Sequence, residues 1–167
     1  MALMRFYWLI DGVLAGCSCP GGSRVHGSPS TSLDSQALAS DLAWLRERGI
    51  SALLTLTEQP LDAGALAASG IENLHLPIED MAPPTPQEFL AALEFIDKKR
   101  ALGQAVAVHC LMGQGRTGSI LAAYLIRGGA SPQEALRELR AACPGAVENL
   151  SQERALASFA ARRDWII

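Results

Sequence analysis

The sequence predicts an α/β fold with a mostly parallel central sheet flanked by helices. Two observations support this prediction. Short apolar runs of the buried-strand type alternate with segments of helical period, and two of the helices begin with recognisable capping boxes. The length of 167 residues suits one domain with a single buried core, so residues 1–167 are expected to form one domain.

The first half of the chain predicts a hairpin, a loop and two helix–strand pairs. Residues 5–10 and 12–16 are short apolar runs joined by Asp11-Gly12, a strong hairpin turn pair. The stretch 17–32 is rich in Gly, Ser and Pro and is expected to be a loop. The elements expected next are a helix over 35–48 that stops at Gly49, a strand over 50–56, a helix around 61–68 that ends at Gly70, and a strand over 71–78.

The second half predicts one strand and four helices. The runs Thr85-Pro86-Gln87-Glu88 and Ser131-Pro132-Gln133-Glu134 each combine a capping box with proline at the first helical position, so each is expected to open a helix. The other elements expected here are a strand over 104–110, an apolar and central helix over 116–129, and a final helix over about 151–163.

Charge and cysteine content narrow the classes of partner. The net charge of −3 gives no reason to expect nucleic acid or an anionic membrane as a partner. The four cysteines fit neither a zinc site nor an evident disulfide framework, so we expect reduced thiols in a cytoplasmic protein. We also expect a monomer. The run "VLAGCS" (13–18) resembles a lipoprotein signal, but the apolar segment before it is too short to favour that interpretation, and no segment is long enough to span a bilayer.

The stretch "HCLMGQGRTG" (109–118) has the features of an anion site. Cys110 ends the predicted strand, and a loop over a helix N-terminus directs backbone N–H groups inward, which favours a bound anion and the thiolate form of Cys110. Arg116 can hold two oxygens of a phosphate. His109 is expected to order the loop through backbone contacts, and Thr117 to donate a hydrogen bond to the sulfur. The residues expected to bind phosphate are Leu111, Met112, Gly113, Gln114, Gly115 and Arg116.

Three other interpretations of this loop fit less well. A Walker phosphate loop needs lysine where Arg116 stands, and its glycine spacing differs. A dinucleotide-binding fingerprint needs glycines spaced G-x-G-x-x-G, which this run lacks. A buried structural cysteine before a glycine-rich turn would leave the position of Arg116 unexplained.

The loop resembles the H-C-x-x-G-x-x-R-[ST]-G motif of the cysteine-dependent protein tyrosine phosphatases, and the chain is most similar to their small atypical dual-specificity (VHZ-like) type. The similarity extends over nearly the whole chain through the runs "WLIDGVLAG" (8–16), "LLTLTE" (53–58), "DMAPPTP" (80–86) and "PGAVENLSQE" (144–153). The resemblance implies a dual-specificity phosphatase fold and hydrolysis of phosphate monoesters through a cysteinyl-phosphate intermediate. It also implies that no metal and no cofactor are needed.

Transfer of a phosphate to Cys110 expels an alkoxide or phenoxide, which needs a proton from a general acid. Asp80 is the preferred candidate because it stands just ahead of a proline-rich run, as the acid of the resembled family does. Glu79 is the alternative, and a solvated turn without a catalytic role is the other interpretation. The same carboxylate would then act as the base that activates water.

Three further positions have open roles. Glu58 recurs in the resembled proteins and either braces the loops of the site or is purely structural, with the structural role favoured. Gln152 either positions the hydrolytic water, as in some relatives, or belongs to a helix cap that begins at Asn149, with the cap favoured. Some relatives have a second cysteine where Thr57 stands, and no pattern decides whether one of the other cysteines replaces it. These are Cys17, Cys19 and Cys143.

The expected substrate is a phosphorylated protein or a small phosphoester, with phosphotyrosine first and phosphoserine or phosphothreonine second. Inositol phosphates or phospholipids are less favoured because the loop lacks the lysines that relatives acting on such lipids often have. A catalytically silent phosphate-binding module and a sulfur-transfer or arsenate-reducing enzyme are the competing classes.

Overall fold

The computed structural model describes residues 3–22 and 35–162, which form five strands and six helices. In chain order these elements are β1 (Phe6–Ile10), β2 (Leu14–Cys17), α1 (Ser35–Glu47), β3 (Ile50–Thr55), α2 (Ala63–Ser69), β4 (Glu72–His75), α3 (Pro86–Ala101), β5 (Ala105–His109), α4 (Gly115–Arg127), α5 (Pro132–Ala142) and α6 (Leu150–Ala161). Most of the loop predicted over 17–32 and the predicted end of the last helix at residue 163 lie outside the described residues.

The strands form one sheet in the order β1-β2-β5-β3-β4. Only the β1–β2 pair, the predicted hairpin, is antiparallel, whereas β2–β5, β5–β3 and β3–β4 are parallel. The predicted α/β class with a mostly parallel sheet is therefore confirmed. Because β5 is the middle strand, its carboxyl end lies at the centre of one edge of the sheet, where ligands of such folds bind.

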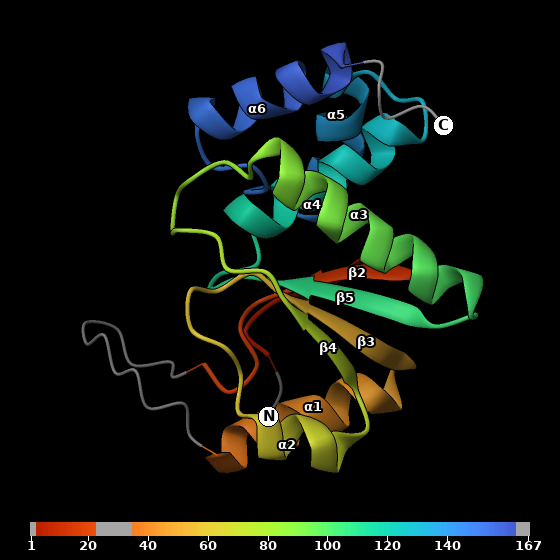
Figure 1. The fold of residues 1–167 in the computed structure, drawn as a ribbon, viewed down its shortest axis with the longest axis vertical. Helices are drawn as coiled ribbons and strands as arrows, with labels where there is room; N and C mark the ends of the chain where they lie inside the picture. Colours follow the sequence, from red (N-terminus) through yellow and green to blue (C-terminus); the bar gives the residue numbers. More distant parts are fainter. Residues whose placement is uncertain (1–2, 23–34, 163–167) are drawn as a thin grey trace.

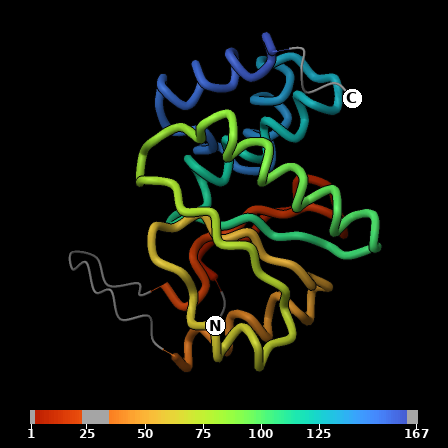
Figure 2. Tube along the Cα trace, viewed as in Figure 1, coloured from red at the N-terminus to blue at the C-terminus, as the bar shows by residue number. Residues whose placement is uncertain are grey.

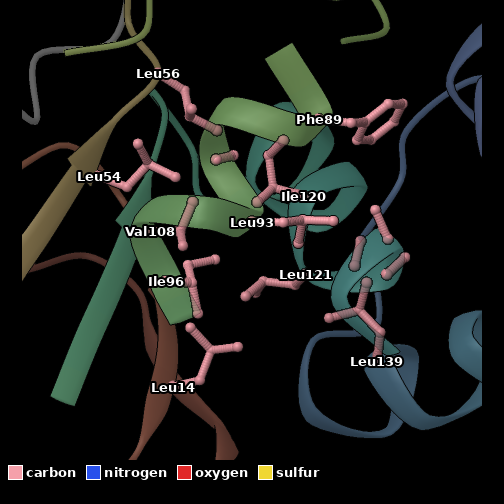
Figure 3. Close-up of a cluster of buried hydrophobic side chains, with 14 of the residues drawn as sticks. Leu14, Leu54, Leu56, Phe89, Leu93, Ile96, Val108, Ile120, Leu121 and Leu139 are labelled. Carbon is pink, nitrogen blue, oxygen red and sulfur yellow. The ribbon is translucent and has the colours of Figure 1, made fainter. Parts of the chain in front are cut away.

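Helices cover both faces of the sheet, as Figure 1 shows: α3 to α6 lie on one face and α1 and α2 on the other. The larger core, which packs α3 to α6 on the sheet, is built from fully buried aliphatic and aromatic side chains (Figure 3) such as Leu14, Leu93, Val108 and Ile120. Leu38, Leu42 and Leu45 of α1 form the centre of the smaller core, because their spacing of four and three residues places them on one face of the helix.

The helix starts agree closely with the predicted signals. Thr85 and Ser131 are the N-caps of α3 and α5, and both capping boxes are complete. α2 begins at Ala63, two residues later than predicted, because the Asp62 side chain accepts a hydrogen bond from the Ala65 N–H and caps the helix there.

The strand predicted over 71–78 is shorter in the structure and ends at His75. Beyond it the Leu76 and Ile78 N–H groups still donate to the Thr55 and Leu56 carbonyls, but these residues are no longer part of a regular strand. The chain then leaves the sheet as an irregular loop, residues 76–85, which crosses the carboxyl edge of the sheet before it enters α3 (Figure 2). The loop between β5 and α4 comprises residues 110–115, the last of which is the first residue of α4. It starts from the same edge of the sheet. The fold therefore brings two loops that are far apart in the sequence to one place.

Candidate active site

Cys110 lies at the base of the 110–115 loop, directly after β5, and is only 3% exposed. The Gly113 N–H donates a hydrogen bond to Cys110 Sγ (3.3 Å), so at least one of the inward-facing N–H groups predicted for this loop points at the sulfur. Gly113 has φ +74°, the left-handed conformation that glycine adopts without strain. A side chain at this position would also meet the backbone of Cys17 at 2.6 Å. The loop therefore depends on a glycine here.

Residues in and beside the N-terminal hairpin donate hydrogen bonds to the backbone carbonyls of the 110–115 loop. Tyr7 Oη donates to the Gly113 carbonyl (2.8 Å), and the Cys19 N–H donates to the Leu111 carbonyl (3.0 Å). Arg5 Nη1 donates to the Met112 carbonyl (2.5 Å). The outward-facing carbonyls of the loop are thus occupied, which leaves its N–H groups for the inner side.

Arg116 stands in the first turn of α4 and is 4% exposed. Its guanidinium donates through Nη1 to the Ile78 carbonyl and through Nη2 to Asp80 Oδ1, both at 2.9 Å. The structure therefore brings Cys110, Arg116 and Asp80 together, as the sequence predicted. Glu79, the alternative acid, lines no part of the cavity that these three share.

The 76–85 loop, in contrast, lies at the surface. The Asp80 side chain is 60% exposed. Two side chains from other parts of the chain brace this loop: Glu58 Oε1 accepts a hydrogen bond from the Asp80 N–H (2.9 Å), and Asn149 Nδ2 donates to the Met81 carbonyl (2.9 Å). Glu58 therefore contacts the candidate acid directly, whereas a purely structural role had been favoured from the sequence.

His109 and Thr117 are fully buried on either side of the loop. His109 Nδ1 lies 3.1 Å from the Cys110 carbonyl and Nε2 lies 2.9 Å from Thr55 Oγ1, so the ring has the expected backbone contact. Burial, with a smaller contribution from the Arg116 charge, lowers the pKa of His109 to about 4, although its hydrogen bond at Cys110 acts in the opposite direction. Thr117 Oγ1 has no hydrogen-bond partner among the described residues, so its predicted bond to the sulfur stays a prediction.

A cavity of ≈ 120 Å³ opens between the two loops. Its lining includes Cys110, Arg116 and Asp80 and two residues from the start of α6 and the turn before it, Glu148 and Gln152. Gln152 belongs to the predicted cap, since its N–H donates to Asn149 Oδ1 (2.9 Å), yet its side chain also faces the cavity. Its Oε1 accepts the Glu148 N–H (2.8 Å), while its buried Nε2 has no partner within the described part of the chain.

The loop side chains differ in direction. Leu111, Met112 and Gly115 line the cavity, as does Arg116, whereas Gly113 and Gln114 are absent from the lining. The Gln114 amide instead lies against Gly145, where Nε2 is 2.0 Å from the position that a Cβ would take. Gln114 therefore contributes its backbone to the loop, and its side chain points away from the cavity.

No sequence pattern indicated a role for Tyr7, Arg5 or Glu148 at this site. Tyr7 is separated from its partner Gly113 by 106 residues and Arg5 from Met112 by 107, so no spacing rule connects them. For Glu148, the nearest signal was the resemblance around Gln152.

The other cysteines lie beneath the site as buried free thiols. Burial and the proximity of the Cys110 sulfur raise the pKa of Cys19 to about 12, and burial raises the pKa of Cys17 well above its usual range. Both thiols are therefore protonated near neutral pH. Within residues 3–22 and 35–162, no helix has the length and apolar character needed to cross a membrane, and no cluster of His, Cys, Asp and Glu has the arrangement of a metal site.

Comparison with known proteins agrees with this geometry. The "Tyrosine-protein phosphatase cdc-14" of Caenorhabditis elegans is 28% identical over 145 residues, and the "Dual specificity protein phosphatase 12" of Rattus norvegicus is 31% identical over 110 residues. These matches cover 85% and 64% of this chain but only 19% and 32% of the two relatives. The crystal structure of Tk-PTP in the active form superposes with a TM-score of 0.75 at 30% identity and covers 93% of this chain and 95% of its own. Human DUSP28 (TM-score 0.70, 19% identity, 93% and 92% covered) shares the fold.

The fold and the Cys110–Arg116 loop are thus those of the small dual-specificity phosphatases of the cysteine-dependent class. The family model described as "Polymorphic toxin system, DSP-PTPase phosphatase" matches residues 28–130, which include both loops of the site. The chain belongs to this family.

Proposed function

We propose that this protein hydrolyses phosphate monoesters, phosphotyrosine first, through a cysteinyl-phosphate intermediate. The observation that carries the proposal is the convergence of a buried cysteine, a buried arginine and an exposed carboxylate, Cys110, Arg116 and Asp80, on one small cavity. The substrates would be phosphorylated proteins or small phosphoesters, and phosphoserine or phosphothreonine would come second.

In the first half-reaction the Cys110 thiolate attacks phosphorus, and the bond from phosphorus to the ester oxygen breaks. The N–H groups of the 110–115 loop and the fork of Arg116 hold the three non-bridging oxygens, on which charge is spread in the transition state. A phosphate dianion in the cavity competes with Asp80 for Arg116 Nη2. Asp80, released from this ion pair, takes up a proton from solvent and, as the neutral acid, donates it to the leaving oxygen. A phenoxide needs this proton less than an alkoxide because it is the better leaving group.

In the second half-reaction water attacks the phosphocysteine and Cys110 leaves as a thiolate. Asp80, now ionised, accepts a proton from that water. Nε2 of Gln152 has no partner among the described residues, and its side chain lines the cavity, so it is available to bind the water or a phosphate oxygen. This supports a role of Gln152 in positioning the hydrolytic water, which was favoured less than the helix cap from the sequence. One residue can have both roles.

The four free thiols support a reducing compartment such as the cytoplasm, and we propose that the protein acts there as a monomer without a metal or cofactor. An inositol phosphate or phospholipid substrate is the second candidate. PTPMT1, whose structure in complex with PI(5)P is known, is 24% identical, which is a likeness of fold alone.

The test is release of phosphate from p-nitrophenyl phosphate and from a phosphotyrosine peptide, with and without a chelator and vanadate. The proposal expects hydrolysis that vanadate inhibits and the chelator does not affect. Cys110→Ser should abolish turnover while a phosphopeptide still binds. If the wild-type protein binds the peptide without releasing phosphate, it is a silent phosphate-binding module, and if it neither binds nor hydrolyses, the proposal is wrong.

A further inference from the structure

The mouth of the cavity carries exposed apolar side chains from both loops. Leu111 and Met112 of the 110–115 loop are 52% and 39% exposed, and Met81 beside Asp80 is 49% exposed. Large apolar side chains are seldom this exposed in clusters, and an exposed apolar group around a cavity usually marks a binding surface. We call these three residues the apolar rim.

The backbone at Met81 shows that the rim is maintained against a local cost. Met81 has φ +64°, a left-handed conformation that non-glycine residues rarely adopt. It is held there because its N–H donates to Asp80 Oδ1 (3.0 Å) and its carbonyl accepts from Asn149. Glycine or asparagine would relieve the strain, so a long apolar side chain at this position suggests a role at the surface.

The cavity is too small to hold a whole substrate. Its volume of ≈ 120 Å³ is well below the roughly 300–1,000 Å³ of pockets that enclose a drug-sized ligand, so it suits a phosphate group and the atoms next to it. The groups on either side of the phosphorylated residue must therefore lie over the rim. Methionine side chains are flexible and polarizable, and they adapt to apolar partners of different shape.

The charges at the mouth decide between a peptide and a membrane. Glu148 lines the cavity beside Gly115, where its Oε2 is 2.9 Å from the position of a Cβ, and Asp80 is the other carboxylate of the lining. The positive charge of Arg116 is used to bind the phosphate group of the substrate. Arg5 is a cation near Met112, which lies three residues before Gly115 in the loop. Nη1 of Arg5 donates a hydrogen bond to the Met112 carbonyl. An anionic bilayer surface would meet Glu148 and Asp80 directly, which like charge disfavours.

We propose that the apolar rim and Glu148 select a polypeptide segment in which an apolar residue adjoins the phosphotyrosine and no acidic residue lies against Glu148. The rim residues contact the apolar neighbour, and Glu148 repels carboxylates or second phosphates on its side of the cavity. This inference rests on the proposed phosphatase activity and adds the substrate class to it.

The experiment compares kcat/KM for phosphotyrosine peptides of one length whose residues on both sides of the phosphotyrosine are leucine, serine or aspartate. A soluble short-chain phosphatidylinositol phosphate is the lipid probe, and p-nitrophenyl phosphate reports the chemistry alone. For the wild-type protein we expect leucine-flanked peptides to exceed serine-flanked ones about tenfold, and aspartate-flanked ones and the lipid to be poorest. A 10-fold ratio corresponds to about 1.4 kcal/mol of discrimination.

Two variants connect the preference to named side chains. Met81→Asn keeps the left-handed conformation that asparagine tolerates, and it should reduce the leucine-to-serine ratio about threefold. Glu148→Gln keeps the size of the side chain and should raise the aspartate-to-serine ratio about fivefold. Because each readout is a ratio within one variant, a general change in activity cancels. Leu102→Asn is the matched control: Leu102 is 65% exposed but lies at the C-cap of α3, before β5 begins, and should leave both ratios unchanged.

Equal kcat/KM for all peptides, or a lipid that outperforms them, would overturn the inference while hydrolysis of p-nitrophenyl phosphate still supported the proposed function. Ratios that do not respond to Met81→Asn and Glu148→Gln would also overturn it. Absence of hydrolysis of every compound would instead remove the proposed function itself.

Discussion

The two loops that meet at the cavity are held in different ways. In the phosphate loop (residues 110–115), Cys110 is 3% exposed, and the hairpin below binds the outward carbonyls. In the acid loop (residues 76–85), the Asp80 side chain is 60% exposed. The bond from its N–H to Glu58 is exposed, and its ion pair with the buried Arg116 is partly buried.

This difference separates two tasks. A group that stabilises the transition state must be in place before the reaction, which favours a rigid and buried loop. A group that donates a proton and then accepts one must reach both substrate and water, which favours an accessible loop. Substitutions in the phosphate loop should therefore impair every substrate and often the fold, whereas substitutions in the acid loop should impair substrates according to their leaving group and spare the fold.

Arg116→Lys should give the largest effect, because Arg116 directly follows the phosphate loop and bonds the acid loop at both Ile78 and Asp80. Lysine keeps the charge but cannot hold two phosphate oxygens in one plane or bond both Ile78 and Asp80. We expect kcat/KM for p-nitrophenyl phosphate and for phosphotyrosine peptides to fall about 10³-fold. Steady-state kinetics check this, and a loss under tenfold would show that charge alone is sufficient.

Gly113→Ala should mainly damage the fold. The new Cβ would lie 2.6 Å from the Cys17 backbone, which cannot move aside cheaply, and alanine disfavours φ +74°. We expect the free energy of unfolding to fall by about 3 kcal/mol, measured by urea denaturation. Gly115→Ala is the matched control, since its Cβ meets the side-chain ends of Gln152 and Glu148 at 2.9 Å instead of backbone, and it should cost less than about 1 kcal/mol. Equal losses for the two variants would contradict the contrast between backbone and side-chain neighbours.

Asp80→Asn should separate the substrates. Without a proton donor, kcat for phosphothreonine peptides should fall about 10²-fold, and kcat for p-nitrophenyl phosphate only about tenfold, because the nitrophenolate leaves more easily. The free energy of unfolding should change by less than about 0.5 kcal/mol, since the pair with Arg116 is largely exposed on the Asp80 side. Glu79→Gln is the control. If it reproduced the loss and Asp80→Asn did not, the acid would be Glu79.

How far the sequence predicts this molecule depends on the range of the signals. The capping boxes at Thr85 and Ser131 and the loop motif from Cys110 to Arg116 are local, and each was located correctly from a few adjacent residues. The parallel sheet followed from the alternation of elements.

The braces of the site could not be predicted in this way. Tyr7 reaches Gly113 across 106 residues and Asn149 reaches Met81 across 68, and such pairs exist only once the elements have packed. Likewise, nothing in the pattern around Gln114 indicates that its side chain turns away toward Gly145. Side-chain direction in an irregular loop is set by its tertiary neighbours.

His109 links the phosphate loop to the pH dependence of stability. Its pKa is lowered from 6.5 to about 4 in the folded protein by burial, so the unfolded chain binds more protons between these values. Stability from this group is therefore complete above about pH 6.5 and decreases as the pH falls toward 4. Between pH 7 and pH 5 the decrease should be about 2 kcal/mol.

The measurement is urea denaturation of the wild-type protein and of His109→Asn at several pH values. Asparagine does not titrate and can still donate to the Cys110 carbonyl, so the wild-type protein should lose more stability than the variant as the pH falls. A difference between the two proteins that is constant with pH would mean that the buried ring does not carry this dependence.

Glu58→Ala should have the smallest effect and tests the acid loop at its brace. Removal of the carboxylate leaves the Asp80 N–H without its acceptor at 2.9 Å, so the acid is positioned less well although its chemistry is intact. We expect kcat for a phosphothreonine peptide to fall about three- to fivefold, and kcat for p-nitrophenyl phosphate to fall less. This corresponds to about 1 kcal/mol, the value of one ordinary hydrogen bond.

Glu58→Gln retains an acceptor oxygen and should restore most of the lost activity, whereas Glu94→Ala, which removes an exposed glutamate from α3, should leave both rates unchanged. If the role of Glu58 were merely structural, the substitution would lower kcat for both substrates equally and would also lower the free energy of unfolding. A positioning role instead predicts the same dependence on leaving group as Asp80→Asn, with a smaller amplitude. In the double variant Glu58→Ala/Asp80→Asn the Glu58 substitution should then have no further effect, because a brace has no catalytic value once the group it positions is gone.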